Sequence, residues 1–242
     1  MMKVLVIIPA YNESENIEKV VDDLIENYPQ YDYVVINDCS TDNTEEILVK
    51  RGYNYISLPA NLGIGGAVQS GYIYAWENGY DVAVQTDGDG QHDPAYIKDL
   101  IAPIEAGEAD MTIGSRFIEK KGFQTSFMRR LGIGFIRVVI RLTCGTRATD
   151  TTSGFRATNK ELTAYFAKEY AQDYPEPEAI VAASLNGFRV RDVAVRMRER
   201  EGGVSSINAL RSVYYMIKVS LALLILRLGT RKKKKKKTKE VS

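Results

Sequence analysis

Short apolar runs alternate with stretches of helical periodicity along the first half of this chain, and this alternation limits the possible folds more than any other feature. The runs that we expect to form strands are Val4–Ile8, Tyr33–Ile36, Tyr55–Leu58, Asp81–Gln85 and Met111–Ile113. Between them, apolar residues recur at helical spacing, as from Ile17 to Ile25. Strands that alternate with helices predict an α/β fold, with a mostly parallel sheet covered by helices on both faces.

Polar residues stand where most of these runs end. They are Tyr11-Asn12-Glu13, Asp38, Asp87 to Gln91, and Ser115-Arg116. In open parallel sheets, ligands bind at the carboxyl ends of the strands. We therefore expect residues that are far apart in the sequence to converge on one edge of the sheet.

Asp87-Gly88-Asp89-Gly90-Gln91 carries the sharpest chemical signal. Two carboxylates separated by one glycine can meet one hard cation, and oxygen ligands suit Mg²⁺ or Mn²⁺. Such a cation would hold a diphosphate and offset the charge on a departing nucleoside diphosphate. A surface turn is the alternative, because Asp and Gly both favour turns. The position directly after an apolar strand favours the metal site.

The turn after the first run and the residue after the second offer groups for a nucleoside. Tyr11 can stack on a base, while Glu13 and Asp38 can accept hydrogen bonds from base or ribose donors. Pro9 stiffens the turn. Helix capping is the alternative role for Asn12, and for Asp38.

A glycine-rich turn, Gly63 to Gly66, leads into a further expected helix. Its glycines do not have the spacing of a dinucleotide-binding fingerprint, and the turn follows the third expected strand. We therefore reject an NAD site and expect close backbone packing at these glycines.

The second half of the chain is less regular. We expect a basic helix over Met128–Thr143, a polar loop over Asp150–Arg156, a helix over Glu176–Asn186 and a strand over Val190–Val195. Val213–Leu228 is the most hydrophobic helix-like segment, but only eight residues, Val219–Leu226, separate Lys218 from Arg227. Because about 20 apolar residues are needed to span a bilayer, the segment predicts an interfacial helix or one that packs on a partner.

Charge is divided unevenly along the chain. Residues 231–242 contain eight Lys or Arg and one Glu, a charge of +7, so the other residues sum to −6 within the total of +1. An acidic body argues against a nucleic-acid partner, which would need positive charge on the fold itself. The tail is either a solvated end or is attracted to anionic lipid, at about 1 kcal/mol per basic residue. The two cysteines, Cys39 and Cys144, form no disulfide framework and favour a reduced, cytoplasmic compartment.

The ordered set of motifs resembles the inverting glycosyltransferase family 2. The motifs are Pro9 to Glu13, Asn37 to Asp42, Asn61-Leu62-Gly63 and Asp87 to His92. Three further motifs resemble its polyprenyl-phosphate branch, which includes dolichyl-phosphate mannosyltransferase and bacterial undecaprenyl-phosphate glycosyltransferases. These are Gly114-Ser115-Arg116, Asp150 to Arg156 and Arg198 to Gly203. The resemblance covers roughly residues 3 to 210.

The resemblance implies a GT-A fold with a Rossmann-like sheet, and a role for each matching residue. Pro9, Tyr11, Glu13 and Asp38 match nucleoside-binding positions, and Asp87, Asp89 and Gln91 match metal ligands, with Asp87 also facing the nucleotide. Arg200 matches a donor-phosphate ligand. Asp89, Arg116 and Arg130 match the catalytic positions, the two arginines near the sugar diphosphate and the acceptor phosphate, although Arg129 can replace Arg130 in this role.

The implied reaction moves a sugar from a nucleotide-sugar to a polyprenyl phosphate at the cytoplasmic face of the cell membrane, with Mg²⁺ or Mn²⁺ as cofactor. A lipid phosphate is already anionic, so it needs positioning and charge cover rather than a strong base. The arginines from Arg116 to Arg156 suit that task, and a solvated basic helix face is the alternative. His92, the only histidine, is expected to be structural and not a base. The roles of Glu176 and Glu178 stay open.

The motifs divide the chain into a glycosyltransferase domain at 1–210, a membrane-interface helix at 211–230 and a polybasic tail at 231–242. Ser205-Ser206 departs from the Ser-Lys of many mannosyltransferases, which favours a UDP-sugar over GDP-mannose. A family-2 transferase with a sugar-hydroxyl acceptor, a nucleotidyltransferase and a non-catalytic nucleotide-binding scaffold are the competing interpretations. A small membrane partner subunit or a homo-oligomer is a further possibility.

Overall fold

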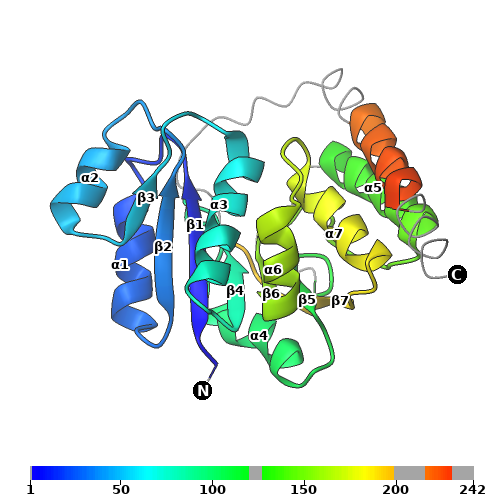
Figure 1. Ribbon diagram of the computed structural model, residues 1–242, viewed down its shortest axis with the longest axis horizontal. Coiled ribbons are helices and arrows are strands. Elements are labelled where there is room, and N and C mark those ends of the chain that lie inside the picture. Colours follow the sequence, from blue (N-terminus) through cyan, green and yellow to red (C-terminus); the bar gives the residue numbers. More distant parts are fainter. Residues whose placement is uncertain (1, 120–126, 199–215, 231–242) are drawn as a thin grey trace, which may run out of the picture.

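A single sheet of seven strands forms the centre of the computed structural model, in the order β3-β2-β1-β4-β6-β5-β7 (Figure 1). The structure describes residues 2–119, 127–198 and 216–230. The strands are β1 Val4–Ala10, β2 Asp32–Asn37, β3 Tyr55–Ser57, β4 Val82–Gln85, β5 Met111–Ser115, β6 Arg156–Asn159 and β7 Val190–Ala194. β6 runs antiparallel to both of its neighbours, while the other pairs are parallel.

Helices cover both faces of the sheet. One face carries α1 Ile17–Asn27, α2 Thr44–Arg51 and α4 Ile97–Glu105, the last preceded by a short 3₁₀ helix, Pro94–Tyr96. The other face carries α3 Gly63–Glu77, α6 Lys160–Lys168 and α7 Pro175–Leu185. α5, Phe127–Cys144, packs on α7 at the side away from β1.

The apolar run of β1 is continuous because both of its faces are buried. Leu5 and Ile7 join the core beneath α3, while Val4, Val6 and Ile8 join the core beneath α1. Strands that are covered on two sides lose the polar alternation of a half-exposed strand. The five strands expected from apolar runs are therefore all present, with ends that differ by a few residues.

β6 was not expected from the sequence, which indicates only a polar loop up to Arg156. Its four residues, Arg156-Ala157-Thr158-Asn159, lack an apolar run, yet they pair with β4 on one side and β5 on the other. Arg156 and Thr158 are fully buried and make polar contacts within the fold. The strand is thus stabilised by long-range pairing and side-chain hydrogen bonds that no local pattern reveals.

A further helix at 216–230, orange to red in Figure 1, lies beside α5. Val219 and Leu223 pack into the same core as Ile136 and Ile140 of α5. Arg227 Nη1 donates to the carbonyl oxygen of Leu142 at 2.6 Å. Residues 213–215 and the boundary expected at 210/211 lie outside the described residues. Within the described part of the chain, no helix has both the length and the apolar character needed to cross a membrane.

The glycines in the first turn of α3 allow close packing, as expected. A Cβ atom at Gly65 would lie 2.4 Å from the carbonyl oxygen of Ala171, and one at Gly66 would lie 2.4 Å from Cβ of Leu62. Gly63 has a φ of +74°, a backbone conformation that favours glycine.

We predict that Gly65→Ala lowers the free energy of unfolding by about 1–3 kcal/mol, because the new methyl group overlaps backbone atoms that cannot rotate away. Gly134→Ala in α5 is the matched control, since a Cβ atom at this position would have no other atom within 4 Å. The control should be neutral or stabilising by up to about 1 kcal/mol through helix propensity. Urea denaturation of both variants measures the difference, and equal midpoints would contradict the packing role.

Candidate active site

Three loops meet at Asp38, at the carboxyl ends of β1 and β2. The Asp38 amide donates to the carbonyl oxygen of Ala10 at 2.9 Å. Its carboxylate Oδ1 accepts from the Leu62 amide at 2.7 Å, and its carbonyl oxygen accepts from Asn61 Nδ2 at 3.2 Å. Asp38 thus joins the loop after β1, the loop after β2 and the start of α3, and it does not cap the helix that follows β2.

The turn after β1 is fixed by Asn12 in a left-handed backbone conformation, with φ 56°. Its amide donates to Ser40 Oγ at 3.0 Å, and its Oδ1 accepts from the Thr41 amide at 2.8 Å. The alternative of a helix cap is therefore wrong for Asn12, because α1 begins later, at Ile17. Tyr11 is 47% exposed beside this turn, so its ring is accessible to a ligand.

The Asp87-to-Gln91 loop packs directly on the turn after β1. A Cβ atom at Gly88 would lie 3.0 Å from the carbonyl oxygen of Pro9 and 3.4 Å from Cγ of Glu13. Glu13 is held in turn by Asn16, whose Nδ2 donates to Oε2 at 2.9 Å. The residues that were expected to bind the nucleoside and those expected to bind the metal therefore share one edge of the sheet.

Asp89 shapes its own loop, because its Oδ1 accepts from the Gln91 amide at 3.0 Å. Gly90 has a φ of +77°, which lets the chain turn sharply between the two. Asp87, Asp89 and Gln91 are all half-buried, so their oxygen atoms are both positioned and partly accessible.

The donor set suits a hard divalent cation but does not complete its coordination. Asp87, Asp89 and Gln91 offer carboxylate and amide oxygens, the ligands that Mg²⁺ and Mn²⁺ prefer. Among the described residues, no group of three or more His, Cys, Asp and Glu side chains gathers where it could hold a metal. A cation here would therefore take its remaining ligands from a diphosphate or from water, as Mg²⁺ commonly does.

His92 is buried next to the carboxylate of Asp87. Its ring is 6% exposed, and it stacks on Phe155 with centroids 4.8 Å apart and an interplanar angle of 11°. Nε2 lies 3.4 Å from Oδ2 of Asp87. Burial lowers the pKa of His92 to about 4, so the imidazole is neutral at physiological pH. A buried ring with so low a pKa is a weak proton acceptor, which suits the expected structural role better than that of a base.

Gly154 brings a second loop against the same carboxylate. A Cβ atom there would lie only 2.8 Å from Oδ1 of Asp87 and 3.2 Å from Nε2 of Gln85. The loop before β6 therefore forms one wall of the site, and a side chain at position 154 would displace Asp87.

Arg116 reaches the same loop through a buried ion pair. Its Nε and Nη2 donate to the two carboxylate oxygens of Asp150 at 2.7 and 2.9 Å. Both side chains are almost completely buried. This geometry holds the guanidinium rigidly beside the loop, and the pairing with Asp150 was not expected from the sequence. The role of Arg116 toward a sugar diphosphate stays a prediction.

The other arginines differ in what they contact. Arg156 is fully buried and donates to the carbonyl oxygens of Ser153 and Glu176, each at 2.7 Å. It therefore ties the loop to the first turn of α7 rather than facing solvent. Arg130 is exposed on α5, whereas the side chain of Arg129 and all of Arg200 lie outside the described part of the structure.

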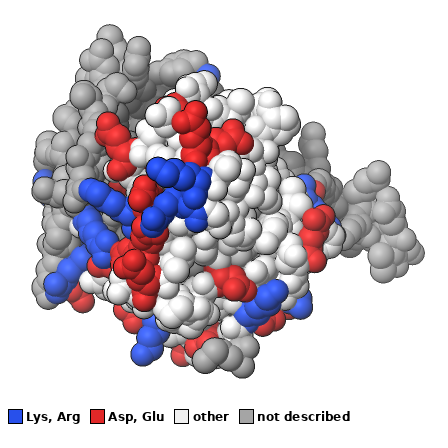
Figure 2. Space-filling view, turned by 90° about the vertical axis from the view of Figure 1, so that its left-hand side faces the viewer, with Lys and Arg blue, Asp and Glu red and all other residues white. Residues whose placement is uncertain are grey.

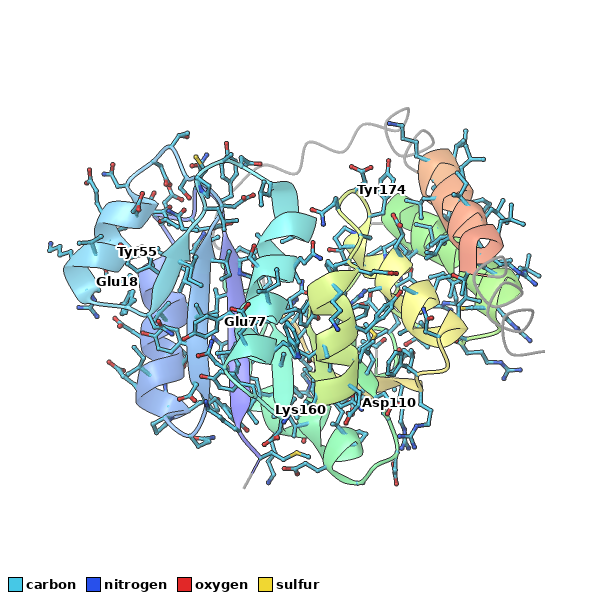
Figure 3. All side chains as sticks on the ribbon, in the orientation of Figure 1. Glu18, Tyr55, Glu77, Asp110, Lys160 and Tyr174 are labelled. Atoms are coloured by element: carbon cyan, nitrogen blue, oxygen red, sulfur yellow. The ribbon has the colours of Figure 1, made fainter. Side chains whose placement is uncertain are left out.

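The first turn of α7 borders this edge of the sheet. Tyr174, which precedes the helix, is seen at the same end of the molecule as the carboxyl ends of the parallel strands (Figure 3). Burial, together with the nearby charge of Asp173, raises the pKa of Glu178. Nothing in these contacts assigns a function to Glu176 or Glu178.

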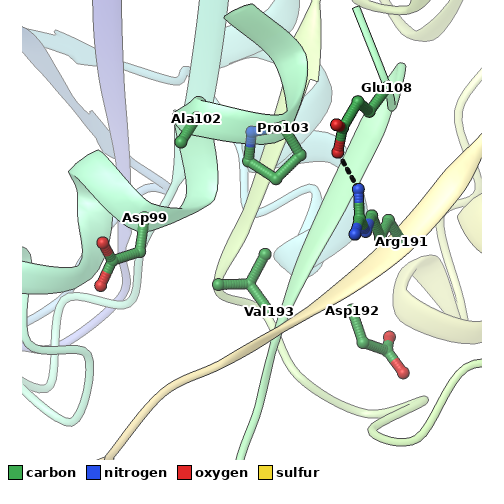
Figure 4. Close-up of a pocket in the computed structure, with 7 residues that line it drawn as sticks. All are labelled: Asp99, Ala102, Pro103, Glu108, Arg191, Asp192 and Val193. Atoms are coloured by element: carbon green, nitrogen blue, oxygen red, sulfur yellow. Dashed lines mark hydrogen bonds and ion pairs between the residues drawn. The ribbon is translucent and has the colours of Figure 1, made fainter. Parts of the chain in front are cut away.

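A shallow hollow of about 370 Å³ lies elsewhere, between α4 and β7 (Figure 4). An ion pair between Glu108 and Arg191 closes one side of it. It is lined by Asp99, Ala102, Pro103, Glu108, Arg191, Asp192 and Val193, none of which belongs to the site expected from the sequence.

Comparison with known proteins agrees with this geometry. The family model for glycosyl transferase family 2 matches residues 5–166. Polyprenol monophosphomannose synthase of Mycolicibacterium smegmatis is 30% identical, over 90% of this chain and 86% of the relative. The UDP-N-acetylglucosamine–dolichyl-phosphate N-acetylglucosaminyltransferase of Methanococcus voltae is also 30% identical, over 93% of this chain and 96% of the relative.

Among solved structures, glucosyl-3-phosphoglycerate synthase of Mycobacterium tuberculosis has a similar fold. In its complex with phosphoglyceric acid the TM-score is 0.71 at 20% identity, over 94% of this chain and 80% of that one. Its complex with Mn²⁺, UDP and glucosyl-3-phosphoglycerate has a TM-score of 0.68 at 21% identity, with the same coverage. The likeness at this identity shows a shared GT-A fold. The family model matches more than half of the chain, and this chain therefore belongs to glycosyl transferase family 2.

Proposed function

We propose that this protein transfers a sugar from a nucleotide-sugar to a polyprenyl phosphate at the cytoplasmic face of the membrane, with inversion at the sugar. The observation that carries the proposal is the convergence of Asp38, the Asp87–Asp89 pair and Arg116 on one edge of the sheet. The relatives named above are synthases and transferases of polyprenol or dolichyl phosphate, which supports a lipid phosphate as acceptor.

The donor would lie across the carboxyl ends of β1, β2 and β4. Tyr11 and Asp38 border the place for the nucleoside, with Pro9 and Glu13 beneath the Asp87 loop. Asp87, Asp89 and Gln91 would hold Mg²⁺ or Mn²⁺, which supplies positive charge against the diphosphate when it is bound. A solved structure with the same fold contains Mn²⁺ and UDP, which supports a divalent metal without selecting between the two ions.

The acceptor step needs no strong base in this chain. An oxygen of the lipid phosphate attacks the anomeric carbon, the bond from that carbon to the diphosphate breaks, and the nucleoside diphosphate leaves with the electron pair. The attacking oxygen is already anionic, which is consistent with the neutral, buried His92 beside the site. Arg116 and Arg130 are the proposed cover for the negative charge, because guanidinium matches phosphate oxygens.

The nucleotide and the sugar of the donor are inferred from the names of the relatives and from one residue. One relative uses UDP-N-acetylglucosamine by its name, while two others are named for mannose. We favour UDP because Ser206 stands where many mannosyltransferases have Lys. A GDP-mannose enzyme is the alternative, and a sugar-hydroxyl acceptor is less favoured because the named relatives act on lipid phosphates. A small membrane subunit or a second copy of the chain would be a further partner.

We predict that Asp89→Asn abolishes Mn²⁺-dependent binding of UDP and lowers transfer by more than about 100-fold. A neutral amide replaces an anionic ligand, and loss of outer partners alone costs 10–100-fold in metal affinity or activity. Asp87→Asn should behave in the same way. Calorimetry with and without Mn²⁺, beside a transfer assay, measures both effects. Asp99→Asn, an exposed acidic residue of α4, serves as control. Full activity in EDTA would rule out the metal.

We predict that Asp38→Asn weakens binding of UDP while the protein stays folded. Asn keeps an oxygen for the Leu62 amide, so the three loops remain joined, but it loses the anionic acceptor for a base or ribose donor. Asp38→Ala should lose both functions and also lower the melting temperature. Calorimetry with UDP and GDP reports the base preference, and tight binding of GDP without binding of UDP would reverse the proposed donor.

We predict that Arg130→Ala impairs transfer to polyprenyl phosphate at least 10-fold and leaves UDP binding unchanged. The exposed guanidinium is proposed to cover the acceptor phosphate, and it lies on a different element from the nucleoside pocket. Arg147→Ala, an exposed arginine beyond the end of α5, is the control. Normal transfer by Arg130→Ala would place the acceptor phosphate at other residues, with Arg129 and Arg137 to be tested next.

A further inference from the structure

α5 presents an exposed apolar stripe that its proposed role in phosphate binding does not explain. The stripe consists of Leu131, Phe135, Val138 and Leu142, whose side chains are all exposed. At 100° per residue these positions fall on one side of the helix, opposite Ile133, Ile136 and Ile140, which are buried. α5 is thus apolar toward the core and apolar toward the outside.

The helix at 216–230 repeats the same spacing. Ile217, Leu221, Leu224 and Leu228 are exposed at i, i+4, i+7 and i+11, as on α5, and Ile225 adds to the stripe at 68% exposure. Val219 and Leu223 point the other way, into the shared core. Two helices of one chain therefore carry matching apolar stripes, each turned away from a common core.

The two helices are fixed side by side and run in the same direction. Near their beginnings, a Cβ atom at Gly132 would lie 3.7 Å from Sδ of Met216. Near their ends, Arg227 donates to the Leu142 carbonyl oxygen. These contacts at both ends align the stripes, so that nine large apolar side chains form one surface, which we name the two-helix face. It consists of Leu131, Phe135, Val138, Leu142, Ile217, Leu221, Leu224, Ile225 and Leu228.

The charged side chains of the two helices themselves are all of one sign. Arg130, Arg141, Lys218 and Arg227 are exposed, and neither helix contains an Asp or a Glu. On the opposite end of the molecule, over α1 and α2, basic and acidic side chains lie next to each other (Figure 2), as in the pairs Arg51–Asp22 and Arg198–Asp23. Along the sequence, the residues after the second helix continue the basic character, with eight Lys or Arg between 231 and 242.

We propose that the two-helix face docks on an anionic lipid bilayer, with both helices lying in the plane of the interface. An apolar stripe flanked by cations is the pattern of helices that bury one side at the head-group boundary. A second copy of the chain fits less well, because two such faces would bring like charges together. The proposal rests on the proposed function for its biological setting, but the surface itself is defined by exposure and charge.

Docking in this orientation would also place the arginines of α5. Arg130, Arg137 and Arg141 recur on one flank of the helix, about 110° from the middle of the apolar stripe. Arg137 turns toward the site, where its Nη2 donates to the carbonyl oxygen of Thr149, next to the Asp150 that holds Arg116. A phosphate group at the depth of the lipid head groups would then meet this arginine flank between the bilayer and the reaction site.

The test is co-sedimentation of the full chain with vesicles of phosphatidylcholine alone or with phosphatidylglycerol. Leu142→Asp in α5 and Ile225→Asp in the second helix are the variants, at side chains that are 72% and 68% exposed. Each should raise the lipid concentration for half-maximal binding by about ten-fold or more, and neither should change the melting temperature or UDP binding. Val49→Asp in α2, at an apolar side chain that is 59% exposed, is the matched control and should bind like the unmodified chain.

Two further measurements vary the salt concentration in vesicle binding and the acceptor in the transfer assay. Binding of the unmodified chain should weaken with salt, because the Debye length falls from about 10 Å at 0.1 M to about 3 Å at 1 M. Transfer to a short-chain, water-soluble prenyl phosphate should be normal in both variants, while transfer to polyprenyl phosphate in vesicles falls. If the unmodified chain binds vesicles but transfers to neither acceptor, the proposed function fails and the docking face stands.

Two results would overturn the docking proposal. One is that Leu142→Asp and Ile225→Asp both sediment with anionic vesicles as well as the unmodified chain does. The other is that the unmodified chain is a dimer without lipid in sedimentation velocity and that either substitution makes it monomeric. In that case the two-helix face is an interface between copies.

Discussion

The site depends on one buried ion pair, that between Arg116 and Asp150. Arg116 follows β5 and Asp150 lies in the loop before β6, so the pair joins two segments that are 34 residues apart. A buried ion pair is stable only with good geometry. Removal of one partner typically lowers the free energy of unfolding by about 3–5 kcal/mol. The same loop continues to Gly154, which touches Asp87. The position of Asp87, which we propose as a metal ligand, is therefore set in part by an ion pair between the loop after β5 and the loop before β6.

The sequence predicted the parts of this architecture that depend on local pattern. The doubly buried strands read as apolar runs, and the polar groups at their ends converge because parallel strands end at one edge. It did not predict contacts that arise only when distant segments meet. Asp150 has no local feature that selects Arg116 as its partner, and Arg156 has the composition of a surface residue although it is fully buried. Asn12 resembles a helix cap in sequence, but its amide and Oδ1 bind Ser40 and Thr41 instead.

α5 combines the features behind two separate proposals, a row of arginines and an exposed apolar stripe. Its four arginines predict phosphate binding, whereas only the burial of its neighbours distinguishes the exposed apolar stripe from the core side. In the sequence, the two apolar sides of the helix are equally hydrophobic. The core side is identified only by the packing of Ile136 and Ile140 on α7 and on the 216–230 helix. The prediction that the last helix packs on a partner or lies at an interface left out α5, because no local pattern links segments 85 residues apart.

The reversed direction of β6 has a consequence for how such a protein can diversify. Because β6 starts at the edge where β4 and β5 end, the loop that enters it lies between the Asp87-to-Gln91 loop and Arg116. The chain beyond this strand then builds α6, α7 and β7, and the family match ends at residue 166, within α6. The residues proposed to contact the nucleoside, from Pro9 to Asp38, precede the reversal, whereas α7, β7 and the helix at 216–230 follow it. A change in length or shape after β6 can therefore alter the side of the sheet that carries β5 and β7 without interrupting β1, β2 and β4, whose ends carry the residues proposed to bind the nucleotide.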